Sequence, residues 1–250
     1  MIPGDTSRVR PSRYARIAGA LYMIVILGGT FAEVLVRSRL VVPGNVAATA
    51  HNLLLHALLY RSGLAVEVFY CACNVPLILL LYHLLKVVNK NVAVMMAVFA
   101  LIADAVESAS LLSAIAPLAM SQDAHALSGF TPEQLNAAAY LSAQLFEQGF
   151  AVSLVFFGFS CLTMAYLIVH SKFLPRIIGI LLAIEGMGYL TNSFTLLLAP
   201  ALEARIFPYF TATAIAEISF SLWLLVMGVD DQRWQRQADA GIVCVQVNVQ

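Results

Sequence analysis

Charged residues are scarce in this sequence. Asp, Glu, Lys and Arg together make up 11% of the chain, whereas apolar residues make up 61%. A soluble domain has about 25% charged and about 45–50% apolar residues, so the composition excludes an ordinary soluble protein. The mean hydropathy of +0.85 predicts a polytopic membrane protein in contact with the lipid bilayer. The formal net charge is zero, so no nucleic-acid partner is implied.

Cysteine is also scarce. Cys71, Cys73 and Cys161 lie in apolar stretches and Cys244 lies in a polar tail. These positions give neither a disulfide framework nor a zinc-binding spacing. We interpret Cys71 and Cys73 as packing residues, because neighbours two apart on a helix point to different faces. The sequence therefore identifies no cofactor and no set of metal ligands.

Lys and Arg are absent from six long apolar stretches, each close to the roughly 20 residues that a helix needs to cross a bilayer. The predicted spans are Ile17–Val36, Leu64–Leu85, Val92–Pro117, Phe150–Val169, Ile177–Leu198 and Tyr209–Gly228. We predict an all-α integral membrane protein, with a six-helix transmembrane domain at residues 17–228. A basic N-terminus at residues 1–16 precedes it and a polar tail at residues 229–250 follows. We expect the first span to stay uncleaved, because it is too long for a signal peptide and no cleavage site follows it.

The 14 Lys and Arg residues are divided unevenly between the two ends of this bundle. With the N-terminus inside, ten lie on the cytoplasmic side and four on the outer side. The ten are Arg8, Arg10, Arg13, Arg16, Lys86, Lys90, Lys172, Arg176, Arg233 and Arg236, and the four are Arg37, Arg39, Arg61 and Arg205. The positive-inside rule therefore places both termini in the cytoplasm of a multi-pass protein of the plasma (inner) membrane.

Two outer segments carry helix signals of their own. Val46–Tyr60 follows a Pro-Gly-Asn turn and is too short to span, so we expect a short interfacial helix there. Thr131 and Gln134 flank Pro132 in the pattern of a capping box, which predicts a helix start. That helix either projects from the membrane or breaks near Gly149. The tail after Gly228 is expected to be a loose end.

Every predicted span carries an acidic residue within it or at its start, although a charge at membrane depth costs about 2.5–3.5 kcal/mol. Asp104 and Glu107 are three residues apart and share one helix face. In the predicted topology Asp104, Glu185 and Glu217 lie nearest the midplane. Exposed to lipid, these three would cost roughly 8–10 kcal/mol, which is comparable to the net stability of a whole protein. They must therefore be protonated, paired, hydrated or bound to a cation.

We infer an acidic cavity open to the outer face, with a vestibule that narrows to a floor of three carboxylates. The candidate ligand- or proton-binding residues are Asp104, Glu107, Glu185, Glu217, Asn192 and Asn74, and the vestibule residues are Glu33, Glu67 and Glu147. Because the spans lack a basic partner, some crowded carboxylates are expected to hold protons at neutral pH. Oxygen ligands also suit hard cations.

Simpler interpretations remain open for the vestibule residues. Glu33 precedes Arg37 by four residues, so a salt bridge at the rim explains it equally well. Glu67 and Glu147 can be solvated acids at helix starts, where the helix dipole favours them.

The sequence resembles a family of bacterial membrane proteins. The resemblance is carried by Tyr14-Ala15-Arg16-Ile17-Ala18-Gly19, Gly28-Gly29-Thr30-Phe31-Ala32-Glu33, Val41-Val42-Pro43-Gly44-Asn45, Phe156-Phe157-Gly158 and Phe173-Leu174-Pro175-Arg176-Ile177-Ile178-Gly179. From about Tyr14 to Gly228 the chain resembles the family of domain of unknown function 4386. The usual turn reads Pro-Gly-Asp, whereas this chain has Asn45. The resemblance implies a multi-pass protein and assigns neither an activity nor a catalytic residue.

Three functions fit these patterns. The first is a protein that binds or moves a proton, a cation or a small cationic ligand through Asp104, Glu185 and Glu217. The second is a structural or regulatory partner of another membrane protein. The third is an intramembrane enzyme that uses two carboxylates as acid and base, although no signature such as HExxH or GxSxG is present.

Overall fold

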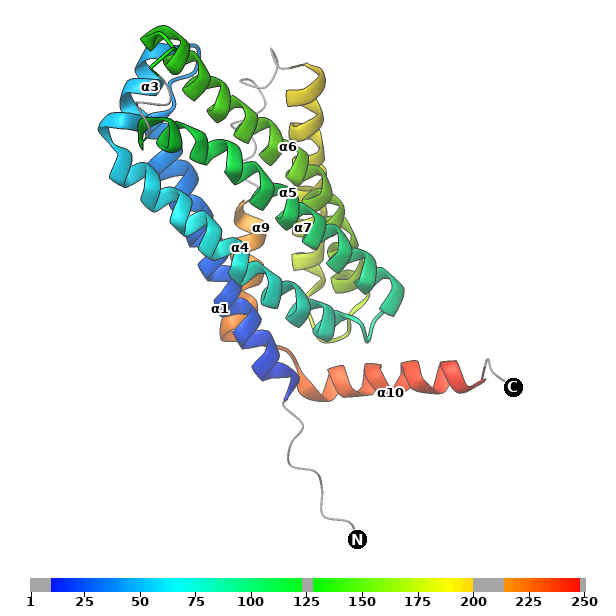
Figure 1. Ribbon diagram of the computed structural model, residues 1–250. Helices are drawn as coiled ribbons and strands as arrows, with labels where there is room; N and C mark the ends of the chain where they lie inside the picture. Colours follow the sequence, from blue (N-terminus) through cyan, green and yellow to red (C-terminus); the bar gives the residue numbers. More distant parts are fainter. Residues whose placement is uncertain (1–9, 123–127, 200–213, 248–250) are drawn as a thin grey trace.

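The computed structural model describes residues 10–122, 128–199 and 214–247, and every element in these ranges is helical (Figure 1). The elements are α1 (Pro11–Thr30), the π-helical segment η1 (Phe31–Arg37), α2 (Ser38–Leu40), α3 (Val46–Leu55), α4 (Ala57–Leu85), α5 (Lys90–Gln122), α6 (Pro132–His170), α7 (Arg176–Leu198), α9 (Ala214–Val226) and α10 (Asp231–Val247). Helix α6 packs between α5 and α7, while α1 packs on α4 and α9.

Five helical stretches in the described residues are long and apolar enough to cross a membrane. They are Pro11–Leu40, Ala57–Leu85, Lys90–Met120, Pro132–His170 and Arg176–Leu198. The predicted all-helical, multi-pass character is thus confirmed. The predicted sixth span, Tyr209–Gly228, begins outside the described residues. Its described part, α9, has 13 residues, which cover only about 20 Å of a hydrocarbon core about 30 Å thick.

The first span is longer than predicted. The sequence places its end at Val36, with Arg37 and Arg39 in an outer loop, but the helix continues through η1 to Leu40. The prediction that Arg37 and Arg39 lie in a loop is therefore wrong. The helix can continue because the Arg37 guanidinium, on a side chain that is only 11% exposed, is paired with carboxylates rather than solvated.

The predicted interfacial helix Val46–Tyr60 is two elements. Helix α3 begins where Oδ1 of Asn45 accepts a hydrogen bond from the Ala48 amide at 2.9 Å, an N-cap that a neutral Asn can supply. It ends at Leu55, and α4 begins at Ala57. Tyr60 therefore belongs to the second span, where its hydroxyl donates to the Ala114 carbonyl of α5 at 2.6 Å. The local pattern predicted a helix correctly but could not locate the break at His56.

Helix α6 begins as predicted and then runs unbroken. Thr131 and Gln134 form both hydrogen bonds of the capping box. The helix continues through Gly149 for 39 residues, so the predicted alternative of a break there is wrong. A Cβ at Gly149 would collide with Ser110 Oγ, so glycine here permits the close approach of α5 and α6.

The tail is helical rather than loose. Helix α10 crosses the end of the bundle where the N-terminus lies (Figure 1). The indole of Trp234 donates to the Leu84 carbonyl at 2.9 Å, and the Asp231 carboxylate accepts from the Ser12 amide at 2.8 Å. These contacts join residues more than 140 positions apart, so no local pattern could predict them.

Candidate functional site

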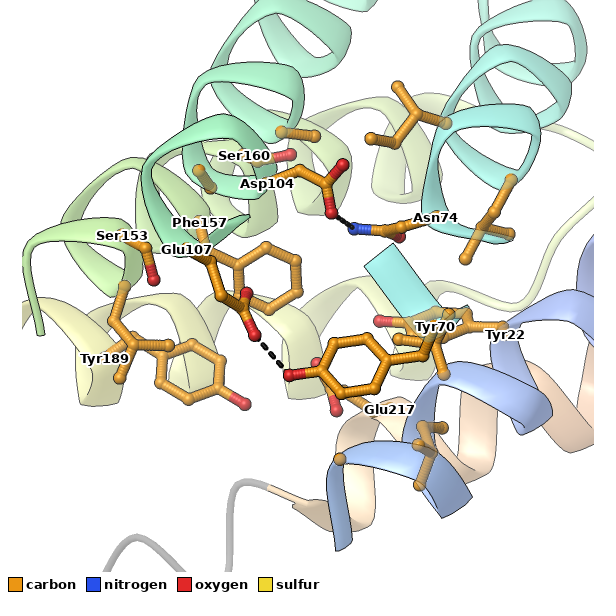
Figure 2. A pocket seen from close by; sticks show the side chains of 18 of the residues that line it. Tyr22, Tyr70, Asn74, Asp104, Glu107, Ser153, Phe157, Ser160, Tyr189 and Glu217 are labelled. Carbon is orange, nitrogen blue, oxygen red and sulfur yellow. Dashed lines mark hydrogen bonds between the residues drawn. The ribbon is translucent and has the colours of Figure 1, made fainter. Parts of the chain in front are cut away.

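A cavity of about 230 Å³ lies between α1, α4, α5 and α6, and α7 and α9 contribute to its wall. The wall is largely apolar, with polar side chains from all six helices. The polar residues are Tyr22, Thr30, Tyr70, Asn74, Asp104, Glu107, Ser153, Ser160, Tyr189 and Glu217. Figure 2 shows most of these side chains around the cavity. The volume lies just below the range of about 300–1,000 Å³ that is usual for ligand sites, so the cavity suits only a small ligand.

Helix α5 presents Asp104 and Glu107 to this cavity. They are three residues apart, so one helix face carries both, as predicted. Oδ1 of Asp104 accepts a hydrogen bond from the Asn74 side-chain amide of α4 at 3.1 Å. Glu107 accepts a hydrogen bond from the Tyr70 hydroxyl, also on α4 (Figure 2). Both carboxylates are therefore held by neutral donors.

Glu217 reaches the cavity from the other side, on α9. Tyr22 of α1 and Tyr189 of α7 lie close to it and also line the cavity. The Tyr22 ring is fixed edge-on against Phe220, with 6.0 Å between ring centroids. Aromatic faces and a carboxylate thus border one space.

Glu185 lies outside the cavity lining. Its side chain is fully buried on α7, with Glu217 and Tyr189 as polar neighbours. Neither carboxylate oxygen has a hydrogen-bond partner in the described part of the chain. The same holds for the buried Oδ1 of Asn192. The structure thus brings Asp104, Glu107 and Glu217 to one cavity and places Glu185 beside it, so the predicted floor of Asp104, Glu185 and Glu217 is not formed.

Two predicted vestibule residues form an ion-pair cluster instead. Arg37 lies between Glu33 and Glu67, with its Nη2 atom 2.5 Å from Oε1 of Glu67. Its guanidinium also lies over the Phe146 ring, 3.8 Å from the centroid. We refer to these four residues as the Arg37 cluster. The alternative interpretation of Glu33, as a salt bridge to Arg37, is confirmed.

The third predicted vestibule residue, Glu147, is half-buried on α6 and does not line the cavity. Tyr140, one turn of α6 from Gln144, accepts a hydrogen bond from the Gly44 amide at 3.0 Å. This part of α6 therefore packs on the loop before α3.

The contribution of α6 to the cavity wall was not predicted from the sequence. Ser153, Phe157 and Ser160 all line it, and their spacing of four and three residues places them on one helix face. That spacing is the sequence feature that could have indicated a cavity wall on α6. It is not specific, because small hydroxyl residues are also common where transmembrane helices pack.

No group of three or more His, Cys, Asp or Glu side chains in the described ranges is arranged to hold a metal ion. Among the described residues, no Lys, Arg or His lines the cavity. The site is thus a partly aromatic pocket in which acidic groups come from two sides, α5 and α9.

Comparison with known proteins identifies a family that matches this chain, but it does not assign an activity to it. The family described as "Domain of unknown function (DUF4386)" matches residues 17–228. A protein of Archaeoglobus fulgidus, named "Uncharacterized protein", is 23% identical over 155 residues, which are 62% of this chain and 76% of the relative. No solved structure matches the chain.

Proposed function

The chain belongs to the DUF4386 family, and we propose that it binds a small organic cation, such as a protonated amine or a quaternary ammonium ion, in the cavity between its helices. One observation carries the proposal. Asp104, Glu107 and Glu217 border the same cavity, and the described residues that line it include no basic side chain. A ligand with one positive charge would supply the missing countercharge.

The shape and chemistry of the wall favour an organic cation over a bare metal ion. Hard metal ions require about six oxygen ligands in close array. Here Asp104 and Glu107 already accept hydrogen bonds from Asn74 and Tyr70, and Glu217 stands on a different helix, α9. The rings of Tyr22 and Tyr189 line the same space, and aromatic faces attract ammonium groups. The apolar remainder of the wall suits a hydrocarbon substituent. The simplest alternative is that the bound cation is a proton, held by the carboxylates.

The topology completes the proposal. We propose that residues 209–228 form a sixth span and that both termini lie in the cytoplasm of a plasma-membrane protein, because ten basic residues then face the cytoplasm and four face outward. The Arg37 cluster would then lie at the outer end. A cysteine introduced at exposed Arg61 should react with an impermeant thiol reagent from outside, and one at exposed Gln235 should not.

Thermal unfolding of the purified protein in detergent tests the ligand. Tetramethylammonium, choline, a primary amine and metal cations are titrated against wild type and Asp104→Asn/Glu217→Gln. A ligand that binds only the folded state stabilises it by RT ln(1 + [L]/Kd), about 2.7 kcal/mol at 100 times Kd. We expect a saturable rise in melting temperature with an ammonium compound, and its loss in the double variant.

The matched control is Glu133→Gln/Asp239→Asn. It removes the same charge from exposed positions outside the cavity and should keep the response. If the melting temperature responds only to pH, and Asp104→Asn/Glu217→Gln loses that response, the bound cation is a proton. If no compound acts and the cavity variant is equally stable, ligand binding is wrong and the role as partner of another membrane protein takes its place.

A further inference from the structure

A second hollow lies where α6, α7, α9 and α10 meet, at the end of the bundle near the N-terminus. It consists of two adjoining pockets of about 470 and 350 Å³ that share Lys172 and Arg233. Trp223 and Met227 line the first pocket. Arg236 and Gln237 complete the second. An apolar slot therefore leads into a cationic one.

The positive charge of the second pocket is only partly neutralised. Arg233 pairs with Asp230 at 3.2 Å, and both are solvent-exposed. Lys172 and Arg236 are exposed, and neither forms an ion pair among the described residues. The charged groups of Lys172 and Arg236 are thus free to bind an anion, and the pocket is large enough to hold one.

Hydrogen bonds hold α10 so that its basic residues stand beside the turn between α6 and α7. Oε1 of Gln237 accepts from the Lys172 amide at 3.0 Å, and its amide nitrogen donates to the His170 carbonyl at 3.4 Å. Arg233 and Arg236 precede Gln237 by four and one residues. Because Gln237 is fastened, these side chains stay near Lys172 rather than moving with a free tail.

The hollow lies at the level where the apolar helices end. Helix α6 ends at His170, α7 begins at Arg176 and α9 ends at Val226. On the apolar helices next to the hollow, Ile177 of α7 and Val226 of α9 are about 60% exposed, as residues facing hydrocarbon are. Helix α10 runs across the ends of these helices rather than along them (Figure 1), which is the orientation of an interfacial helix.

We propose that this hollow binds the headgroup of an anionic phospholipid of the bilayer. The phosphate lies between Lys172 and Arg236, with Arg233 at its edge, and an acyl chain follows the slot along Trp223 and Met227. Basic pockets at the ends of transmembrane helices suit such headgroups, and a lipid is the one anion whose tail would fill the apolar slot. The site is separate from the cavity and does not depend on the ligand proposed there.

The chain contains two tryptophans. Trp223 lines the slot, whereas Trp234 lies on α10 and lines neither pocket. The fluorescence of Trp223 therefore reports the occupancy of the slot. The full-length protein is placed in phosphatidylcholine vesicles with increasing fractions of phosphatidylglycerol brominated on its acyl chains, and in parallel with brominated phosphatidylcholine. We expect saturable quenching at a low fraction of the anionic lipid and weak, proportional quenching by the neutral one.

Lys172→Gln/Arg236→Gln should reduce the preference for the anionic lipid by about tenfold or more, because each basic group near a membrane surface contributes about 1 kcal/mol to such binding. The matched control, Arg39→Gln/Arg61→Gln, removes the same charge from exposed residues at the opposite end and should keep the preference. Equal melting temperatures in neutral detergent check that the variants are folded.

Three results would overturn the proposal. These are equal quenching by the two lipids in wild type, an equal loss of preference in the control variant, and reversal of the quenching by millimolar inorganic phosphate. The last result would assign the pocket to a free anion instead of a lipid.

Discussion

Two regions of this bundle bury carboxylates in opposite ways. At the α3 end, Glu67 is 3% exposed and pairs directly with the Arg37 guanidinium, which also contacts Phe146. In the cavity, Asp104 and Glu107 receive only neutral donors. The first arrangement gives the buried Glu67 carboxylate a cation within the protein. The second leaves the negative charge to be matched by something else.

This difference separates structural from functional acids. A buried charge without its partner is strongly destabilising, whereas a complete pair is close to neutral for stability. In the Arg37 cluster the buried Glu67 carboxylate has its cation, and the second carboxylate, Glu33, is half-exposed to solvent, so the cluster has no need of a ligand. No described residue of the cavity lining supplies a positive charge, so under the proposed function the charge of its carboxylates is offset by protons or a cation.

The largest effect is expected where the complete pair is broken. Arg37→Gln leaves the buried Glu67 carboxylate without its cation and should destabilise the protein by about 3–5 kcal/mol, measured by thermal or denaturant unfolding in detergent. Arg37→Gln/Glu67→Gln removes both charges and should recover much of the loss. If the double variant is as unstable as the single one, packing of Arg37 on Phe146, rather than charge pairing, holds this region.

A smaller loss is expected for Tyr70→Phe. The substitution removes the hydroxyl that donates to Glu107 while keeping the ring, so the cost is that of one hydrogen bond to a charged group, about 1.5–3 kcal/mol. Tyr82→Phe provides a control on the same helix, away from the cavity lining, and should be near neutral. Unfolding curves of the two variants give the comparison, and equal losses would contradict a specific role for the Tyr70 hydroxyl.

How far the sequence predicted these two regions depends on the distance along the chain between partners. The Glu33–Arg37 pair and the face shared by Asp104 and Glu107 follow from spacings of four and three residues, and both were predicted. The contact of Arg37 with Glu67 joins residues 30 apart. It depends on the packing of α4 against the π-helical segment, for which the sequence carries no periodic signal.

The sequence predicted that Glu185 and Glu217 lie near each other, but it did not predict which of them faces the cavity. Helical spacing and span positions placed Glu185 and Glu217 at similar depth, and in the structure they are polar neighbours. Which of them faces the cavity depends on the rotation of α7 against α6. The small residues at that contact, Gly158 and Gly186, set this packing. A single sequence does not show which small residues will lie at a contact between two helices.

A still smaller effect is expected at the exposed edge of the Arg37 cluster. The Glu33 side chain is 49% exposed, so its pair with Arg37 is screened by solvent and is worth only about 0–1 kcal/mol. Glu33→Gln should therefore shift the melting temperature little, and the shift should shrink further in high salt. A loss as large as that of Arg37→Gln would show that Glu33, and not Glu67, is the partner on which the cluster depends.

The smallest effect on stability, and the largest on binding, is expected for Asp104→Asn. An Asn side chain has nearly the same shape, and its oxygen can still accept the hydrogen bond that Asn74 now donates at 3.1 Å. Because the substitution removes a charge that no described basic residue of the cavity lining offsets, stability should be unchanged or slightly higher, as is common where a site is kept for function rather than stability. The melting temperature without ligand and the ligand-induced shift are measured on the same sample. A stable variant that has lost its response to ammonium compounds would place Asp104 in the binding site, whereas a variant that unfolds as readily as Arg37→Gln would make Asp104 a structural residue and remove the distinction between the two regions.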